Sequence, residues 1–216
     1  MSVDSGIRAV SVDAEEAGII AASRAYNLIK NAPDIASGFD RLAAYALNTT
    51  SLEAFDIQRI LAVYRTHTPD ISLPPESRSL IESLISEKET IGLITDGRSI
   101  AQRAKVKALG LDRYISPDNI LISQEIGTDK HWPTAFEEIE RRNPSEPSFV
   151  YVGDNPAKDF FWPNKLGWHT VMLLDIDHTN IHPQSHVDIT ADNDYNARHF
   201  IQRLSELPTL LQSFNR

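Results

Sequence analysis

The stretch "FVYVGDNPAKD" (149–159) combines a strand pattern with two acids. Its first four residues are apolar, as in a buried strand. Gly153 and Asp154 follow directly, and a second acid, Asp159, comes five positions after Asp154. Read alone, the two acids permit three interpretations: a surface turn, a helix cap, or half of a metal site. The neighbouring segments of the chain decide among these interpretations.

Short apolar runs of the same kind recur along the chain. They are rich in Val, Ile and Leu and lack strict alternation, which is typical of a parallel sheet covered on both faces. Helical patterns separate them, so we predict an α/β fold with a doubly wound, mainly parallel sheet. The predicted strands cover residues 8–13, 90–95, 120–123, 149–154 and 169–174. The predicted helices cover residues 99–111, 132–143, 158–167 and 197–214.

The segment between the first two predicted strands follows a different pattern. Apolar side chains recur there at helical spacing, and no strand pattern interrupts them. A Pro-rich stretch, "TPDISLPPES" (68–77), predicts an extended return to the sheet. We therefore predict a small all-helical cap at residues 14–87, inserted after strand one. The α/β core would then consist of residues 1–13 and 88–216.

The composition is that of a globular protein. The chain has 216 residues, of which 41% are apolar and 24% charged, and a formal net charge of −9. The negative charge disfavours nucleic acid or an anionic membrane surface as the main partner. The absence of cysteine excludes disulfides and thiolate chemistry. No apolar run is long enough for a membrane span, and the first residues lack a signal-peptide pattern, so we expect a cytoplasmic protein.

Polar residues follow three of the predicted strands. The carboxyl ends of parallel strands meet at one edge of a sheet, where ligands collect. We therefore expect these side chains to approach one crevice, together with Lys130, which precedes a predicted helix. The predicted set is Asp13, Glu15, Thr95, Asp96, Gly97, Arg98, Ser99, Lys130, Asp154 and Asp159.

This set of side chains suits phosphoryl transfer. Mg²⁺ prefers hard oxygen ligands, usually one or two carboxylates together with water and phosphate oxygens. A hydroxyl such as Thr95 and an ammonium such as Lys130 can hold the remaining phosphate oxygens. A carboxylate in line with phosphorus can attack it and form an aspartyl phosphate.

Three segments resemble motifs two, three and four of the haloacid dehalogenase (HAD) superfamily: "LITDGRSIAQRAKVKALGLDRYI" (93–115), "GTDK" (127–130) and "YVGDNPAKD" (151–159). Their order and spacing are specific, with 35 residues from Thr95 to Lys130 and 24 from Lys130 to Asp154. The resemblance is to phosphatase-like members with a helical cap between motifs one and two. It implies a Mg²⁺-dependent phosphatase that acts on a small phosphorylated metabolite.

The resemblance also implies a role for each matching residue. Thr95 would hydrogen-bond the transferring phosphoryl group, and Lys130 would neutralise the phosphate and the nucleophile. Asp154 would hold Mg²⁺, with Asp159 as a second ligand or an orienting group. The residues beside motif two would shape the substrate pocket, and Asp96 would also support the turn; these are Asp96, Gly97, Arg98 and Ser99.

Motif one departs from the family pattern. Family members open with a strand followed by Asp-x-Asp, in which the first Asp is the nucleophile and the second the general acid/base. In "VSVDAEEAG" (10–18), Asp13 takes the nucleophile's place and Glu15, longer by one methylene, takes that of the acid/base. Both would also lie beside the Mg²⁺ ion. Errors near 1 Å can cost about 100-fold in rate.

Three functions therefore stay open. The first is a phosphatase that works through an aspartyl phosphate. The second is a catalytically impaired relative that binds a phosphorylated ligand or a partner. Dehalogenation, the third, is less favoured, because a haloacid does not need Mg²⁺ to neutralise a phosphate.

Overall fold

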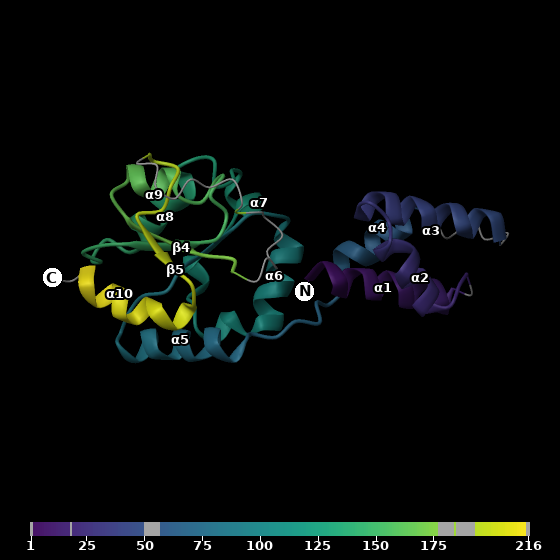
Figure 1. Ribbon diagram of the computed structural model, residues 1–216, viewed down its shortest axis with the longest axis horizontal. Helices are drawn as coiled ribbons and strands as arrows, with labels where there is room; N and C mark the ends of the chain where they lie inside the picture. Colours follow the sequence, from purple (N-terminus) through teal and green to yellow (C-terminus); the bar gives the residue numbers. More distant parts are fainter. Residues whose placement is uncertain (1, 18, 50–56, 177–183, 185–192, 215–216) are drawn as a thin grey trace. The chain divides into compact units, whose positions relative to one another are not determined.

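The computed structural model describes residues 2–17, 19–49, 57–176, 184 and 193–214 (Figure 1). The chain divides into two compact units. We call the first, residues 1–72 with 103–109, the helical unit. The second, residues 73–102 with 110–216, is the α/β unit.

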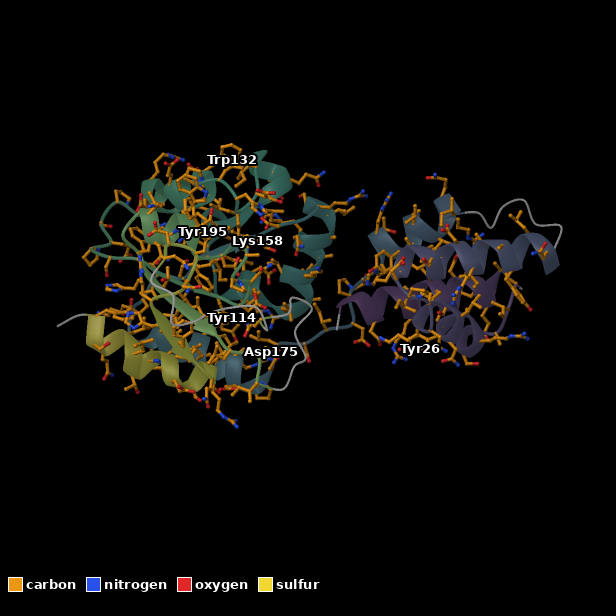
Figure 2. All side chains as sticks on the ribbon, turned by 45° about the horizontal axis from the view of Figure 1, so that its top comes forward. Tyr26, Tyr114, Trp132, Lys158, Asp175 and Tyr195 are labelled. Atoms are coloured by element: carbon orange, nitrogen blue, oxygen red, sulfur yellow. The ribbon has the colours of Figure 1, made fainter. Side chains whose placement is uncertain are left out.

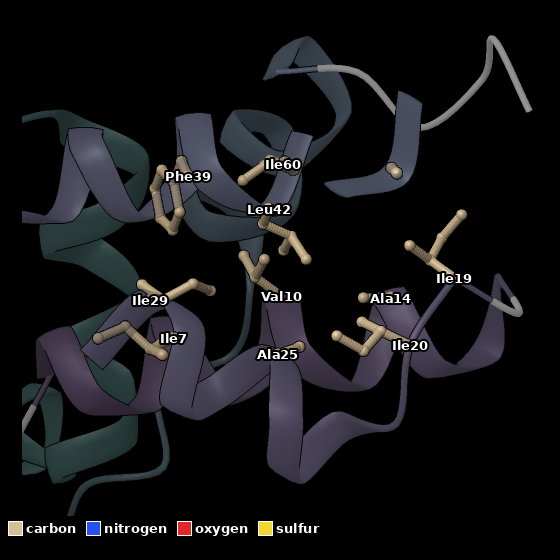
Figure 3. Close-up of a cluster of buried hydrophobic side chains, with 11 residues drawn as sticks. Ile7, Val10, Ala14, Ile19, Ile20, Ala25, Ile29, Phe39, Leu42 and Ile60 are labelled. Atoms are coloured by element: carbon tan, nitrogen blue, oxygen red, sulfur yellow. The ribbon is translucent and has the colours of Figure 1, made fainter. Parts of the chain in front are cut away.

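The helical unit is built from amphipathic helices around one apolar core. Its helices are α1 (Ser2–Glu16), α2 (Ala22–Lys30), α3 (Ile35–Thr49) and α4 (Ile57–Thr66). Figure 3 shows side chains from these helices meeting in the core. Ile7 and Val10 of α1 contribute to it together with Phe39 and Leu42 of α3 and Ile60 of α4. These helices correspond to most of the predicted cap.

The predicted strand at residues 8–13 is wrong, because these residues belong to helix α1. The reason lies in the spacing of the buried side chains. Ile7, Val10 and Ala14 are buried, whereas Val12 is 48% exposed. A strand would place Val10 and Val12 on the same face, while a helix places Ile7, Val10 and Ala14 on one face. The period of three to four residues therefore decides the structure.

The α/β unit alternates strands with helices, as predicted. Its strands are β1 (Leu93–Thr95), β2 (Ile120–Ile122), β3 (Val150–Gly153), β4 (His169–Leu173) and β5 (His199–Ile201). Its longer helices are α5 (Pro75–Ser86), α6 (Ser99–Leu109, whose last residues group with the helical unit), α8 (Thr134–Arg142) and α10 (Leu207–Phe214). Shorter helical segments are η1 (Leu111–Arg113), η2 (Pro117–Asn119), α7 (Ser123–Ile126), α9 (Phe161–Lys165) and η3 (Leu204–Glu206).

The strands form two parallel sheets. β1 pairs with β2, and Thr95 lies opposite Ile122. The second sheet has the order β3-β4-β5, and Gly153 lies opposite Met172. All described pairings are parallel, which confirms the predicted α/β class.

Helices cover both faces of the second sheet. Val150 and Val152 of β3 pack in a cluster with Leu207 and Leu211 of α10. Tyr151, between them in sequence, packs on the other face in a cluster with Phe136 of α8. Figure 1 shows α5 and α10 side by side beneath β4 and β5, with α8 and α9 above them. Apolar side chains on both faces explain why the strands lack alternation.

Two further segments differ from the prediction. Residues 199–201 form strand β5, where a helix over 197–214 was predicted; only the part from Leu207 to Phe214 is the helix α10. The Pro-rich return to the sheet ends at Pro74, because Pro75 begins helix α5, a position that Pro favours. The first compact unit ends at residue 72 and includes residues 1–13, whereas the predicted cap covers residues 14–87.

None of the helices in the described part of the chain is both long and apolar enough to span a membrane.

Candidate functional site

The carboxyl end of β1 forms a tight turn that leads into α6. Gly97 has φ +139°, and a Cβ there would lie 2.5 Å from the Gln102 side-chain nitrogen, so a side chain would be strained and would displace Gln102. The Gln102 side chain in turn donates to the Asp96 carbonyl at 2.8 Å. The turn thus holds Asp96 and Thr95 in a fixed position at the strand end.

Thr95 and Arg98 have side chains that the turn itself does not use. Within the described part of the chain, the Thr95 hydroxyl forms no hydrogen bond and the Arg98 side chain forms no ion pair. Ser99, by contrast, donates its hydroxyl to Glu125 at 2.5 Å. The two groups expected to contact a substrate are therefore available, while Ser99 stabilises the loop.

The carboxyl end of β3 is organised by Asp159, which is 1% exposed. Its Oδ2 accepts the backbone N–H groups of Asp154 at 3.2 Å and Asn155 at 2.9 Å. A Cβ at Gly153 would lie 2.7 Å from the same oxygen, so this close approach requires glycine. The spacing of "GDNPAKD" thus has a physical reason: the last acid fastens the loop that begins with the first.

Lys130 joins this carboxylate from another loop. Its Nζ donates to Asp159 Oδ1 at 2.5 Å and to the Tyr151 hydroxyl at 3.3 Å. The Lys130 side chain is 12% exposed. An ammonium group has three donors, so one donor of Lys130 is not used by the described residues. Lys130 of motif three and Asp159 of motif four therefore lie in contact.

A second lysine, Lys158, connects motif four to motif two. Its Nζ donates to Asp96 Oδ2 at 2.6 Å, and the Lys130 backbone N–H donates to Asp96 Oδ1 at 3.2 Å. Figure 2 labels Lys158 among the side chains of the α/β unit. The Asp96 carboxylate is thus a structural link between the three motifs, while its carbonyl takes part in the turn.

The carboxylates at this edge affect the pKa of Tyr151. Burial is the main cause that raises the pKa of Tyr151 well above its usual value, and the charges of Asp159, Asp96 and Asp154 raise it further. The hydroxyl therefore stays protonated and can donate to Asp159, which lies 3.5 Å away. All three acids lie near enough to one phenol to act on its charge.

The charges at this edge bear on whether a cation could bind there. They are those of Asp96, Asp154, Asp159, Lys130 and Lys158. Three carboxylates and two ammonium groups lie near this edge, and a phosphate dianion would add two further negative charges. A divalent cation bound with the phosphate would correct this balance. Among the described residues no group of three acids or histidines is placed to hold a metal. Mg²⁺ needs only one or two protein carboxylates, so the donor set fits it through Asp154.

Asp159 does not fit the role of second metal ligand. Both of its oxygens accept hydrogen bonds, from two backbone N–H groups on one side and from Lys130 and Tyr151 on the other. Binding a cation there would displace Lys130. The contacts support the other expectation for Asp159, that it orients its neighbours.

Asp13 and Glu15 do not lie at a strand end. Both are in the last turns of α1, in the helical unit. Asp13 accepts two hydrogen bonds from the Arg59 guanidinium, at 2.8 and 2.9 Å. Glu15 accepts the backbone N–H of Ala22 at 3.3 Å, where α2 begins. Their expected place beside Thr95 rested on the strand at 8–13, which the helix replaces.

Sequence reasoning missed three residues of the edge. Lys158 and Tyr151 stand inside the quoted motif, and no pattern in the sequence singles them out. The third is Gln184, whose side-chain N–H groups donate to the carbonyls of Asp154 at 2.8 Å and Leu173 at 3.0 Å. Gln184 ties the ends of β3 and β4 together, and nothing local in the sequence indicates it.

The chain matches a known protein family. Residues 34–173 match the family model of haloacid dehalogenase-like hydrolases. The matched range includes Thr95, Lys130, Asp154 and Asp159, whereas Asp13 and Glu15 lie before it.

Two curated relatives carry phosphatase names. The chain is 32% identical over 100 residues to a glyceraldehyde 3-phosphate phosphatase of Methanopyrus kandleri, a match that covers 46% of this chain and 42% of the relative. It is 28% identical over 156 residues to a ribulose-1,5-bisphosphate 5-phosphatase of Halopiger xanaduensis, covering 69% and 61%. The matches thus span less than two thirds of each relative.

Solved structures share the fold. A 2-haloacid dehalogenase from Pseudomonas syringae pv. Tomato superposes with a TM-score of 0.59 at 20% identity, covering 99% of this chain and 92% of that one. A HAD phosphatase from Thermococcus onnurineus gives a TM-score of 0.53 at 20% identity, covering 95% and 87%. These likenesses concern the fold alone. With the family match over residues 34–173 and the converging motifs, the chain belongs to the haloacid dehalogenase-like hydrolases.

Proposed function

We propose that this protein hydrolyses phosphate monoesters of a small metabolite at the edge formed by Thr95, Lys130 and Asp154. The observation that carries the proposal is the convergence of three motifs through two lysine–carboxylate pairs, Lys130 with Asp159 and Lys158 with Asp96. The phosphatase names of two relatives support a triose or pentose phosphate as the substrate class.

Each residue would act through the contacts that surround it. The Thr95 hydroxyl and the remaining donor of Lys130 would hold phosphate oxygens, which fixes the phosphorus at the strand ends. Arg98, exposed at the start of α6, would contact the rest of the substrate. Asp154 would hold Mg²⁺, which when bound neutralises charge on the phosphate.

The hydrolysis would proceed by two displacements. An aspartate carboxylate forms a bond to phosphorus while the ester P–O bond breaks, and the departing oxygen takes up a proton. Water then attacks the acyl phosphate, which releases inorganic phosphate and restores the carboxylate. Asp96 and Asp159 are each paired with a lysine, so neither suits the attacking role.

A second candidate function rests on α1. Asp13, the residue expected to attack, is paired with Arg59 within the helical unit. This pairing favours a protein that binds a phosphorylated ligand without turning it over. The two candidates differ in one measurable property, turnover.

The test measures inorganic phosphate released from a panel of phosphate esters, with Mg²⁺ or with a chelator. The panel includes glyceraldehyde 3-phosphate and ribulose 1,5-bisphosphate. We expect Thr95→Val, which removes a hydroxyl at nearly constant volume, to lower kcat/KM by roughly 100-fold, as removal of one transition-state donor does. Asp154→Asn should abolish the Mg²⁺ dependence, whereas Asp112→Asn, an exposed acid in η1, serves as the matched control.

The outcomes separate the two candidates. Absence of turnover across the panel, with phosphate and Mg²⁺ still bound in calorimetry, would leave the binding function. Equal activity in wild type and Thr95→Val would contradict the site. Loss of turnover in a folded Asp13→Asn variant would reinstate Asp13 as the nucleophile.

A further inference from the structure

Asp154 lies one residue beyond the paired part of β3. The pairing of β3 with β4 ends at Gly153, which lies opposite Met172. A residue just outside the ladder keeps one backbone conformation only if other groups hold its N–H and C=O. This matters for a metal ligand, because Mg²⁺ demands nearly ideal octahedral geometry, with oxygens at about 2.0–2.1 Å.

Asp159 holds the backbone of Asp154 from the amide side. Its Oδ2 accepts the N–H of Asp154 at 3.2 Å and the N–H of Asn155 at 2.9 Å. These two N–H groups belong to the peptide planes before and after the Asp154 Cα. The carbonyl of Asp154 points away from the second N–H, as in every trans peptide, so it needs a different donor.

Gln184 supplies that donor from 30 positions further along the chain. Its Nε2 donates to the Asp154 carbonyl at 2.8 Å and to the Leu173 carbonyl at 3.0 Å. Its Oε1 accepts the backbone N–H of Asp175 at 2.8 Å. The side-chain amide thus uses both donors and an acceptor on backbone groups. It joins the ends of β3 and β4 one step beyond Gly153.

The peptide plane that follows Asp154 is consequently held at both ends. Gln184 binds its C=O and Asp159 binds its N–H. Asp159 also binds the N–H of the preceding plane. Because peptide units are planar, only φ and ψ of Asp154 can turn one plane against the other. Holding both planes fixes these two angles, and with them the direction of the Asp154 Cα–Cβ bond.

We propose that Gln184 is a positioning residue for Asp154, and that its hydrogen bond to the Asp154 carbonyl sets the direction in which the carboxylate meets Mg²⁺. Gln184 contacts neither the ion nor the substrate in this role. The proposal rests on the proposed function in taking Asp154 as the Mg²⁺ ligand, but it does not require turnover. Loss of a group that orients a metal ligand typically costs about 10- to 100-fold in metal affinity.

The experiment measures Mn²⁺ binding to the full chain from the electron paramagnetic resonance signal of the free ion, with Mg²⁺ as the competitor. Mn²⁺ takes the same oxygen ligands as Mg²⁺. Gln184→Met keeps the length of the side chain but has no amide, so it should raise the dissociation constant by about 10- to 100-fold. Gln184→Asn keeps the amide but is shorter by one methylene, and it should give a smaller increase. This second variant decides the question if the first does not fold.

Asn164 offers a matched control, because its amide makes the same kind of contacts elsewhere in the α/β unit. Its Nδ2 donates to the carbonyls of Asp194 at 2.8 Å and Asn196 at 2.7 Å. Its Oδ1 accepts the Thr170 hydroxyl at 2.7 Å. Asn164→Leu removes these three hydrogen bonds at nearly constant volume. It should lower the urea midpoint of unfolding as Gln184→Met does, but bind Mn²⁺ like wild type.

The affinities decide whether Gln184 acts through Asp154. Wild-type affinity in folded Gln184→Met would overturn the proposal. An equal loss of affinity in Asn164→Leu would overturn it as well, because general destabilisation would then explain both losses. Asp154→Asn should bind Mn²⁺ at least as weakly as Gln184→Met. Wild-type affinity in Asp154→Asn would mean that the ion binds elsewhere, which also overturns the proposal.

Phosphate release at increasing Mg²⁺ separates this proposal from the proposed function. The Mg²⁺ concentration that gives half-maximal release should rise in Gln184→Met by the same factor as the dissociation constant. An unchanged value in an active Gln184→Met enzyme would overturn the positioning role and leave the phosphatase function standing. Weaker Mn²⁺ binding in Gln184→Met, with no release by wild type from any ester, would confirm the positioning role and contradict the phosphatase function.

Discussion

Two valine-rich segments of this chain end in aspartate, and they have different structures. "FVYVGD" (149–154) contains β3, whereas "RAVSVD" (8–13) lies within the helix α1. The difference comes from their flanks. After Asp154 the chain continues with Asn-Pro and a loop held by Asp159, which ends the strand. Around residues 8–13, Ile7 and Ala14 continue a helical apolar stripe into the core. A strand assignment thus depends on residues beyond the run itself.

The aspartates that end the two segments, Asp154 and Asp13, also have different surroundings. Asp154 precedes a loop fixed by a buried carboxylate and two lysines. Asp13 pairs with Arg59 on a partly exposed surface, where the side chains are 18% and 39% exposed. The first acid belongs to a polar network within the α/β unit, while the second links two helices of the helical unit.

The largest effect is expected from breaking the buried pair at Asp159. Asp159→Asn leaves Lys130 without its carboxylate, which should lower the free energy of unfolding by about 3 kcal/mol, since loss of one partner of a buried pair costs 3–5 kcal/mol. The three tryptophans all lie in the α/β unit, so their fluorescence follows its unfolding in urea. Asp13→Asn, followed by circular dichroism, should cost no more than about 1 kcal/mol, as for exposed pairs. Similar losses of stability in both variants would contradict the expectation that the buried ion pair contributes more than the exposed one.

A smaller loss is expected from Gly153→Ala. The added Cβ would lie 2.7 Å from Asp159 Oδ2, so the loop must shift to admit it. Overpacking of this kind should cost about 2 kcal/mol in urea unfolding. Gly127→Ala is a control for glycine replacement without crowding, because nothing lies within 4 Å of its Cβ position, although its positive φ adds some strain. A larger loss at Gly127 than at Gly153 would show that the close approach to Asp159 is not what requires glycine.

The helical structure of residues 8–13 can be tested by two substitutions that add a hydroxyl at nearly constant volume. Val10→Thr places a hydroxyl in the apolar core, where the carbonyl four residues earlier is its local partner, and should lower stability by about 1.5 kcal/mol. Val12→Thr, at an exposed position, should change it by less than about 0.5 kcal/mol. Thermal unfolding followed by circular dichroism gives both values. Equal losses of stability in Val10→Thr and Val12→Thr would favour a strand, because both valines lie on the same face of a strand.

The smallest expected effect is a change in the stability of the α/β unit with pH. Burial, and then the neighbouring His169, lower the pKa of His199. The unfolded chain therefore binds this proton at a higher pH than the folded chain, so stability should fall as pH drops through about 6.5. We expect His199→Gln to show a smaller fall in Tm between about pH 8 and pH 5.5 than wild type. His131→Gln, at an exposed position, should behave like wild type.

Much of the α/β unit could be predicted from the sequence because its signals are local. Four apolar runs became β1 to β4, since uninterrupted Val and Ile between helical patterns is typical of central strands. The structure brings Lys130 to Asp96 and Asp159, which lie beyond the ends of β1 and β3, because parallel strand ends share an edge. β5 was missed because "HFI" is too short to stand out beside the apolar residues of α10.

The rest of the candidate site depends on contacts that span long distances in sequence. Lys158 meets Asp96 across 62 positions, and the sequence holds no pattern for that pairing. The error at residues 8–13 had a local cause, because the strand pattern was judged without Ile7 and Ala14. Resemblance to a motif cannot replace the period of the buried side chains.

The contacts among Asp96, Lys130, Lys158 and Asp159 also bear on the order of folding. Its pairs join residues that are 29, 34 and 62 positions apart, so each contact closes a long loop before it contributes stability. Helices of the helical unit form from much closer neighbours. If these contacts form after the transition state, their loss accelerates unfolding and leaves the folding rate nearly unchanged. This edge would then be among the last parts of the chain to assemble and would chiefly determine how long the folded state persists.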